Sequence, residues 1–336
     1  MNPIKAHGGP DALGVPAHDF STNGNAHGPC PQALAAVSAA DATRYPDPTY
    51  TGLRTQLADW HGIDPGRVLL AASASEFIHR ISAWVAQRGP QAVWLPRHAY
   101  GEYGAAALAW GLRTVPSAAD AGLAWACEPS RPLGQAHEEL VALVRTAPMC
   151  VLDRAYEPLR LEGASTLDAQ ALQRVWQLWS PNKALGLTGV RAAYVIAPLE
   201  AGSAGAELEA RCPSWPLGAQ GVALLQAWVR ADVQAWLQDS RDTLRLWKAR
   251  QLALCRALGW DCAPSLANFF CARTTLQGKQ ALAQALLALR LQGIKLRAAS
   301  SFGLPGQVRL GVLPPASQDA LRTAWQDLMQ VGEVPA

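Results

Sequence analysis

Short apolar runs recur along the first two thirds of the chain, separated by polar or amphipathic stretches. A short run of mostly apolar residues between Gly, Pro or polar residues is typical of a buried strand. Helical spacing follows the first run, as in Phe77, Ile78 and Ile81. The sequence therefore predicts an α/β fold with a mostly parallel sheet. Its strands are predicted at 67–72, 91–95, 123–127, 149–153, 175–179 and 192–197.

The pattern changes near residue 235. A helical stretch with apolar Val222, Leu225 and Trp228 leads to this point. Beyond it the sequence predicts a helix and shorter strands, at 268–271, 280–291, 294–297 and 308–312. The beginning of the chain is rich in glycine and small polar residues, which is typical of turns. We expect an N-terminal arm with part of the small domain (1–40), a large domain (41–235) and a small α+β domain (236–336).

The composition favours an enzyme of the cell interior. Half of the 336 residues are hydrophobic and 16% are charged, which suits a large core and two domains. No apolar segment reaches the roughly 18 residues that a spanning helix needs, and the N-terminus lacks a secretory pattern. We expect a cytoplasmic protein without a membrane partner.

Charge and cysteines narrow the range of ligands. The net charge of +3 is small and the basic residues are dispersed, so nucleic acid is not an expected partner. The seven cysteines show no paired metal spacing and are odd in number, which favours reduced, buried thiols. We expect no metal site.

One lysine lies alone between two predicted strands. Lys183 follows the run 175–179 and precedes Gly186, Gly189 and Arg191. A lysine amine that is partly shielded from water near another cation can act as a Schiff-base nucleophile. A surface lysine in a glycine-rich turn is the alternative.

The segment Ser-x-x-Lys-x-x-Gly-Leu-x-Gly-x-Arg, from Ser180 to Arg191, resembles the cofactor-lysine segment of the fold-type I pyridoxal-phosphate enzymes. The branch in question holds histidinol-phosphate aminotransferase and the threonine-phosphate decarboxylase of the cobalamin pathway. The resemblance implies the aspartate aminotransferase fold and pyridoxal 5′-phosphate as cofactor. It also implies a Schiff base at Lys183, with Ser180 and Arg191 at the cofactor phosphate.

Two further segments match the family's cofactor site. Ala74 and Ser75 follow a predicted strand and open a helix, whose first N–H groups can bind an anion. The resemblance implies that both contact the cofactor phosphate, and ordinary capping by Ser73 is the alternative. Tyr100 matches the aromatic residue that stacks on the cofactor ring.

Asp153 ends a predicted strand within an Asp-x-Ala-Tyr segment. An acid there can keep the pyridine nitrogen protonated, and the resemblance gives Asp153 this role and Tyr156 the phenolic oxygen; a helix cap is the alternative for Asp153. Arg131, in Glu-Pro-Ser-Arg-Pro-Leu-Gly, replaces the asparagine that usually donates to that oxygen. An arginine can donate there too, or it can point away.

The N-terminal third holds matches to substrate and subunit contacts. The segment 19–29 resembles an arm that crosses the active-site mouth, which implies that Asn23 faces the substrate. His7, in His-Gly-Gly, matches a substrate-phosphate residue, and a frayed terminal residue is the alternative. Tyr45, in Tyr-Pro-Asp-Pro, matches a tyrosine that reaches the cofactor phosphate of the neighbouring subunit, which implies a homodimer. A turn tyrosine packed on a helix is the alternative.

Arg297 and Arg309 bracket the loop 300–306. Guanidinium groups grip carboxylates and phosphates in a fixed plane, so the pair suits an anionic substrate. The resemblance assigns the substrate α-carboxylate to Arg309 and a substrate phosphate to Arg297. Two surface arginines on edge strands are the alternative.

The resemblance leaves the reaction open. His-Gly-Gly, the Ser-Ser-Phe-Gly-Leu-Pro-Gly loop and the short chain favour a threonine-phosphate decarboxylase-like enzyme acting on a phosphorylated amino acid. An aminotransferase of the histidinol-phosphate type is the alternative. A third hypothesis is a catalytically weak ligand-binding protein on the same fold; it is favoured by Arg131, which replaces the usual asparagine.

Overall fold

The computed structural model describes residues 8–276 and 278–331. Its centre is a seven-stranded sheet in the order β2-β8-β7-β6-β5-β3-β4. Strand β8 is antiparallel to both neighbours, and the other pairings are parallel. The sequence predicted all but the short edge strand β4. The strands are β2 (Val68–Ala71), β3 (Ala92–Trp94), β4 (Arg113–Thr114), β5 (Leu123–Cys127), β6 (Cys150–Asp153), β7 (Trp176–Trp179) and β8 (Ala193–Ile196).

Alternate side chains of β2 enter two apolar clusters on opposite faces of this sheet. Val68 and Leu70 join one cluster with α1, α2 and α8, while Leu69 and Ala71 join the other with α3, α4 and α7. This alternation follows from the two-residue period of a strand. It explains why the central strands read as continuous apolar runs. The helices are α1 (Pro31–Ser38), α2 (Thr51–His61), α3 (Ala74–Ala86), α4 (Gly101–Ala109), α5 (Leu140–Thr146), α6 (Ala169–Leu172), α7 (Ala204–Glu209) and α8 (Ala219–Trp228).

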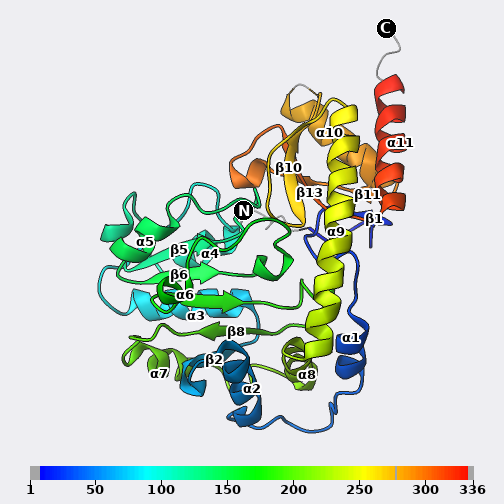
Figure 1. The fold of residues 1–336 in the computed structure, drawn as a ribbon. Helices are drawn as coiled ribbons and strands as arrows, with labels where there is room; N and C mark the ends of the chain where they lie inside the picture. The colour runs from blue at the N-terminus through cyan, green and yellow to red at the C-terminus, as the bar shows by residue number, and fades with distance from the viewer. Residues whose placement is uncertain (1–7, 277, 332–336) are drawn as a thin grey trace.

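A smaller antiparallel sheet, in the order β12-β13-β10-β9, lies beside the large one (Figure 1). The predicted strand 294–297 is corrected into two, because β11 pairs with β1 of the N-terminal arm whereas β12 pairs with β13. The elements are β1 (His18–Asp19), β9 (Asp261–Cys262), β10 (Phe269–Arg273), α10 (Lys279–Leu291), β11 (Ile294–Lys295), β12 (Arg297–Ala298), β13 (Gln307–Gly311) and α11 (Pro315–Val331).

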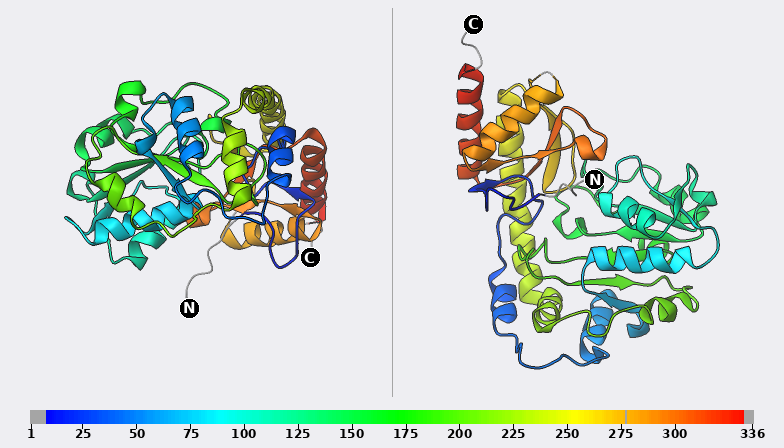
Figure 2. Two further views of the ribbon diagram at one scale, coloured as in Figure 1. Left: turned by 90° about the horizontal axis from the view of Figure 1, so that it is seen from below. Right: turned by 180° about the vertical axis from the view of Figure 1, so that it is seen from behind.

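The long helix α9 (Ala231–Ala257) connects the two sheets. At 1.5 Å per residue its 27 residues span about 40 Å, and Figure 2 shows it running past the large sheet to the small one. Its buried Lys248 donates to Glu162 at 2.8 Å, and its buried Gln251 donates to the carbonyl of Gly311 at 3.0 Å. The predicted domain boundary at residue 235 falls inside this helix and stays a prediction.

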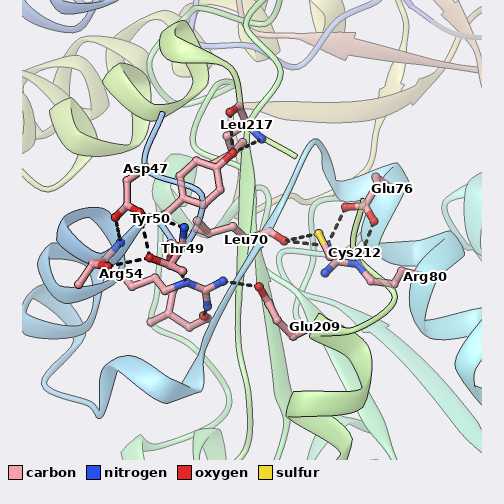
Figure 3. A network of polar contacts seen from close by, with 12 residues as sticks. Asp47, Thr49, Tyr50, Arg54, Leu70, Glu76, Arg80, Glu209, Cys212 and Leu217 are labelled. Carbon is pink, nitrogen blue, oxygen red and sulfur yellow. Dashed lines mark hydrogen bonds and ion pairs between the residues drawn. The ribbon is translucent and has the colours of Figure 1, made fainter. Parts of the chain in front are cut away.

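Polar contacts fix α2 and the turn before it (Figure 3). Asp47 accepts the backbone N–H of Thr51 at 2.7 Å, and the Tyr50 hydroxyl donates to the carbonyl of Leu217 at 2.8 Å. Arg54 contacts Glu209 of α7 at 2.5 Å. These contacts join the Tyr-Pro-Asp-Pro corner and α2 to α7 and to the segment before α8.

The described part of the chain lacks two features, a membrane-spanning helix and a cluster of metal-ligating side chains. None of the helices within 8–276 and 278–331 has a stretch long and apolar enough to cross a bilayer. In the same residues, no group of three or more His, Cys, Asp or Glu side chains is arranged to hold a metal ion. The seven cysteines form no disulfide.

Candidate active site

One pocket collects most of the residues that the sequence assigned to the cofactor. It lies where β5, β6 and β7 end and where β8 begins. Because β8 is antiparallel, its first residues meet the carboxyl ends of the parallel strands, where α/β sheets bind ligands. Nine predicted residues line the pocket, namely Ala74, Ser75, Tyr100, Arg131, Asp153, Tyr156, Ser180, Lys183 and Arg191. Five lining residues were not predicted, namely Ser73, Cys127, Ala155, Asn182 and Ala192.

Lys183 is half-buried on the turn that follows β7. Its Nζ donates to Ser180 Oγ at 3.1 Å and lies 5.8 Å from the centre of the Tyr156 ring. The turn needs Gly186, since this residue has a φ of +68° and an added Cβ would lie 3.1 Å from the Cα of Pro29. The N-terminal arm therefore packs directly on the turn that presents the lysine.

One end of the pocket is built for an anion. Ser73 caps α3 by accepting the N–H of Glu76 at 3.1 Å, and the first-turn N–H groups of Ala74 and Ser75 have no intrahelical acceptor. The exposed Arg191 side chain makes no ion pair within the described residues. A helix N-terminus with an available guanidinium suits a phosphate.

The other end of the pocket holds a buried carboxylate. Asp153 Oδ2 accepts the Tyr103 hydroxyl at 2.6 Å, and Oδ1 accepts the backbone N–H of Ala155 at 2.9 Å. Burial, and then Asp153, raise the pKa of Tyr103 well above its usual value, so the hydroxyl stays a donor. Its ring stacks on Trp125 at 4.3 Å. Tyr103 was not predicted at the site, although it lies on α4 three residues after Tyr100, which caps that helix.

Arg131 reaches the middle of the site from the turn 128–134. Its guanidinium carbon lies 4.2 Å from the centre of the Tyr100 ring and 5.4 Å from that of Phe302. No ion pair with a described residue involves Arg131, and its buried Nε has no hydrogen-bond partner there. The sequence left open whether Arg131 reaches the site or points away from it. The side chain points into the pocket.

Arg309 and Arg297 are buried neighbours on β13 and β12, contrary to their alternative reading as surface residues. Arg309 donates to the carbonyl of Ser21 at 2.7 Å, and Arg297 donates to Ser301 Oγ at 2.8 Å. Burial, and then Arg131, lower the pKa of Arg309 to about 10. The guanidinium carbons of Arg297 and Arg309 lie 5.1 Å and 5.6 Å from the centre of the Phe302 ring. We call Arg131, Arg297 and Arg309 the Phe302 arginines.

The remaining predicted residues lie outside the pocket lining. The buried side-chain amide of Asn23 has no hydrogen-bond partner in the described chain. Tyr45 is 79% exposed and stacks on Trp215 with 4.5 Å between ring centres, so its role toward a neighbouring subunit stays a prediction. His7 lies outside the described residues.

A family comparison identifies the chain. The model of the family described as aminotransferase class I and II matches residues 16–328. The chain belongs to this family. Its members' cofactor is pyridoxal 5′-phosphate, and this aminotransferase-family chain is a pyridoxal-phosphate enzyme, as the sequence predicted. The catalytically weak binding protein is thereby set aside.

Curated relatives of this aminotransferase-family chain are named histidinol-phosphate aminotransferase. One from Jannaschia sp. (strain CCS1) is 27% identical over 321 residues, which cover 88% of this chain and 87% of the relative. One from Akkermansia muciniphila is 28% identical over 334 residues, which cover 90% and 88%.

Solved structures share the fold of this aminotransferase-family chain. Histidinol-phosphate aminotransferase from Sinorhizobium meliloti, in complex with pyridoxal-5′-phosphate, has a TM-score of 0.81 at 21% identity, covering 98% of both chains. L-threonine-O-3-phosphate decarboxylase from Porphyromonas gingivalis has a TM-score of 0.72 at 19% identity, covering 92% of this chain and 97% of that one. At these identities the likeness concerns the fold.

The pocket of this aminotransferase-family chain suits its cofactor chemically. The anion-binding end offers N–H groups, a hydroxyl and Arg191 for a phosphate. The opposite end offers Asp153, a buried carboxylate of the kind that holds a protonated ring nitrogen. Lys183 lies in the same pocket, as a Schiff-base lysine requires.

Proposed function

We propose that the protein is an aminotransferase whose substrate is a small phosphorylated amine or amino acid. The observation that carries this proposal is the single pocket that holds Lys183, Asp153 and the N-terminus of α3. The names of the curated relatives support an aminotransferase better than the decarboxylase that the sequence put first.

The phosphate of the cofactor is assigned to the anion-binding end of the pocket. Its partners are the N–H of Ala74, the hydroxyls of Ser75 and Ser180, and the guanidinium of Arg191. These groups belong to the ends of three different segments, so only the folded sheet brings them together.

Tyr100 and Ala155 line the same pocket and would face the ring of the cofactor. Asp153 would hold the proton at the ring nitrogen, and its two hydrogen bonds keep the carboxylate in place. Tyr156 would donate to the ring hydroxyl. Pyridoxal phosphate, when bound, supplies an electron-accepting ring that stabilises negative charge at the substrate's α-carbon.

Lys183 moves the proton at the α-carbon. Within the described residues no carboxylate pairs with its amine, which donates to Ser180 Oγ at 3.1 Å. An amine with so weak an anchor can swing between the cofactor and the substrate and act as general base and acid.

The substrate is assigned to the buried arginines of the small sheet. Arg309 binds a carboxylate, because two of its nitrogens lack partners among the described residues. Arg297 binds the substrate phosphate. Asn23 faces the substrate with an amide that has no internal partner, and His7 is proposed beside the substrate phosphate.

We also propose a homodimer in which Tyr45 serves the neighbouring subunit's cofactor phosphate. The proposal is supported by the exposure of the stacked pair Tyr45 and Trp215, which a second chain would cover.

A decarboxylase acting on threonine phosphate is the second candidate. Threonine phosphate carries a carboxylate and a phosphate, whereas histidinol phosphate carries a phosphate alone. Two buried arginines side by side, Arg297 and Arg309, suit the former substrate.

The products decide between the two reactions. Purified protein would receive histidinol phosphate with 2-oxoglutarate, and separately threonine phosphate, while glutamate and carbon dioxide are followed. We expect glutamate without carbon dioxide from the first mixture, and carbon dioxide from the second would promote the decarboxylase. The Lys183→Ala variant should lose at least about 1,000-fold in rate, whereas Lys279→Ala on the exposed start of α10 should not.

A further inference from the structure

Two arginines in the cleft carry buried charge without a carboxylate partner in the described chain. Neither Arg131 nor Arg309 forms an ion pair there, and both have buried guanidinium nitrogens without hydrogen bonds. Leaving a buried cation unpaired is costly, and the cost is removed by an anion that reaches it. The cleft therefore has places for two negative charges.

The carboxylate that shares the pocket with Arg131 is already engaged. Both oxygens of Asp153 accept hydrogen bonds, one from Tyr103 and one from the N–H of Ala155. The guanidinium of Arg131 instead lies against the rings of Tyr100 and Phe302. An arginine held on aromatic rings keeps its planar edge available for a bidentate anion.

Phe302 joins Arg131 to the substrate side of the cleft. Its ring lies within 5.6 Å of the guanidinium carbon of each of the three Phe302 arginines. Its carbonyl accepts the Nδ1–H of His98 at 2.6 Å, which ties this loop to the large sheet. Arg131 thus lies at the border between the cofactor pocket and the arginines of the small sheet.

The turn that carries Arg131 is held by two contacts from the small-sheet side. The N–H of Leu266 donates to the carbonyl of Gly134 at 2.6 Å, and Cys271 Sγ contacts the carbonyl of Pro132 at 3.4 Å. An added Cβ on Gly134 would lie 2.2 Å from Ser265 Oγ, so the chain passes too closely for any other residue. Because this turn is held in place, the guanidinium of Arg131 has a defined position and can favour ligands whose anionic group reaches that position.

We propose that Arg131 is a specificity-determining residue that joins Arg297 at the Phe302 ring in binding the second anionic group of the substrate, while Arg309 binds the first. The preferred substrate then carries two acidic groups, such as a carboxylate and a phosphate. The inference rests on the proposed function, because it concerns the substrate of the same site. It departs from the family resemblance, in which this position serves the cofactor through an asparagine.

Equilibrium binding to the cofactor-loaded protein tests the proposal without turnover. The probes are 3-phosphonopropionate, which has two acidic groups, and butyrate, which has one; neither has an amine that could react. By titration calorimetry we expect Arg131→Asn to weaken 3-phosphonopropionate at least about 10-fold and butyrate less than about 3-fold. Arg131→Lys should fall between, because it keeps the charge and loses the planar fork.

The controls distinguish binding of the substrate by Arg131 from binding of the cofactor and from a general loss of positive charge. Arg145→Asn removes an exposed arginine on α5 and should bind both probes like the parent protein. If Arg131→Asn leaves the preference for 3-phosphonopropionate intact, the proposal is wrong; if that variant also loses visible cofactor absorbance, Arg131 serves the cofactor instead. A parent protein that retains no cofactor would refute the proposed function, and titrating it with the same two probes would still decide the preference that Arg131 confers.

Discussion

The two sides of the active-site cleft differ in how their charges are satisfied. At Asp153 both carboxylate oxygens accept hydrogen bonds from the protein, within a wall of stacked aromatic rings. On the side of the cleft near Phe302, the guanidinium groups of Arg131 and Arg309 have buried nitrogens with no hydrogen-bond partner in the described chain. The carboxylate assigned to the cofactor is already oriented by hydrogen bonds from the protein. The arginines assigned to the substrate have nitrogens that can form new hydrogen bonds when the ligand binds.

The largest effect is expected from removing the charge of Asp153. The Asp153→Asn variant keeps the size and an oxygen acceptor for Tyr103 but cannot hold a proton at the ring nitrogen. We expect kcat to fall about 100- to 1,000-fold, with a melting temperature close to that of the parent. Steady-state rates and calorimetry measure both, and an unchanged kcat would contradict the assignment.

The Arg309→Met variant tests the opposite side. Methionine keeps much of the volume and removes the buried cation. We expect KM for the anionic substrate to rise about 30- to 100-fold, while the free energy of unfolding changes by less than about 1 kcal/mol, because the lost bond to Ser21 is offset by relief of an unpaired charge. Denaturant unfolding without ligand checks the second part, and a large loss of stability there would mean that the charge is satisfied inside the protein.

A smaller change on the satisfied side is Tyr103→Phe. It removes one donor to Asp153 and leaves the stacking on Trp125 in place. We expect about 1–3 kcal/mol of lost stability and less than a 10-fold change in kcat, since the Ala155 bond remains. Tyr100→Phe removes a hydroxyl of the same pocket that has no hydrogen bond to Asp153, and it is the matched control for stability.

The smallest effect on activity is expected outside the cleft, at His61. Burial, and then Arg154, lower the pKa of His61 to about 4, and its Nε2 lies 2.9 Å from the Tyr194 hydroxyl. Between pH 6.5 and 4 the unfolded chain takes up a proton that the folded protein refuses, so stability falls as the pH falls. The contribution is at most about 3 kcal/mol. As the pH is lowered from 6.5 to 4, the melting temperature of the parent should fall more than that of His61→Gln.

The sequence predicted the cofactor pocket better than the substrate side. Each cofactor residue follows or opens an apolar run, and parallel strands bring such positions to one edge, so Asp153 and Lys183 were predictable from local pattern and resemblance. The role of Tyr103 could not be predicted, because it depends on a hydrogen bond between α4 and β6, to a residue fifty positions away in the chain.

The arrangement around Phe302 could not be read from the chain. Arg131, Arg297 and Arg309 come from three segments whose approach depends on how the small sheet docks. The run 294–297 was read as one strand because its apolar alternation is continuous, whereas β11 and β12 divide it between two sheets. Pairing partners are a tertiary property that short strands do not encode locally.

The link between Leu266 and Gly134 has a mechanical consequence. The segment before β10 belongs to the small sheet, and it holds the turn of Arg131 through the Leu266–Gly134 hydrogen bond and the contact from Cys271 to Pro132. The same turn is tied to the large sheet, because the N–H of Glu128 donates to the carbonyl of Asp153 at 3.2 Å. The distance between Arg131 and Arg309 is therefore set by contacts to both sheets, and it limits the length of a ligand whose two anionic groups reach both arginines.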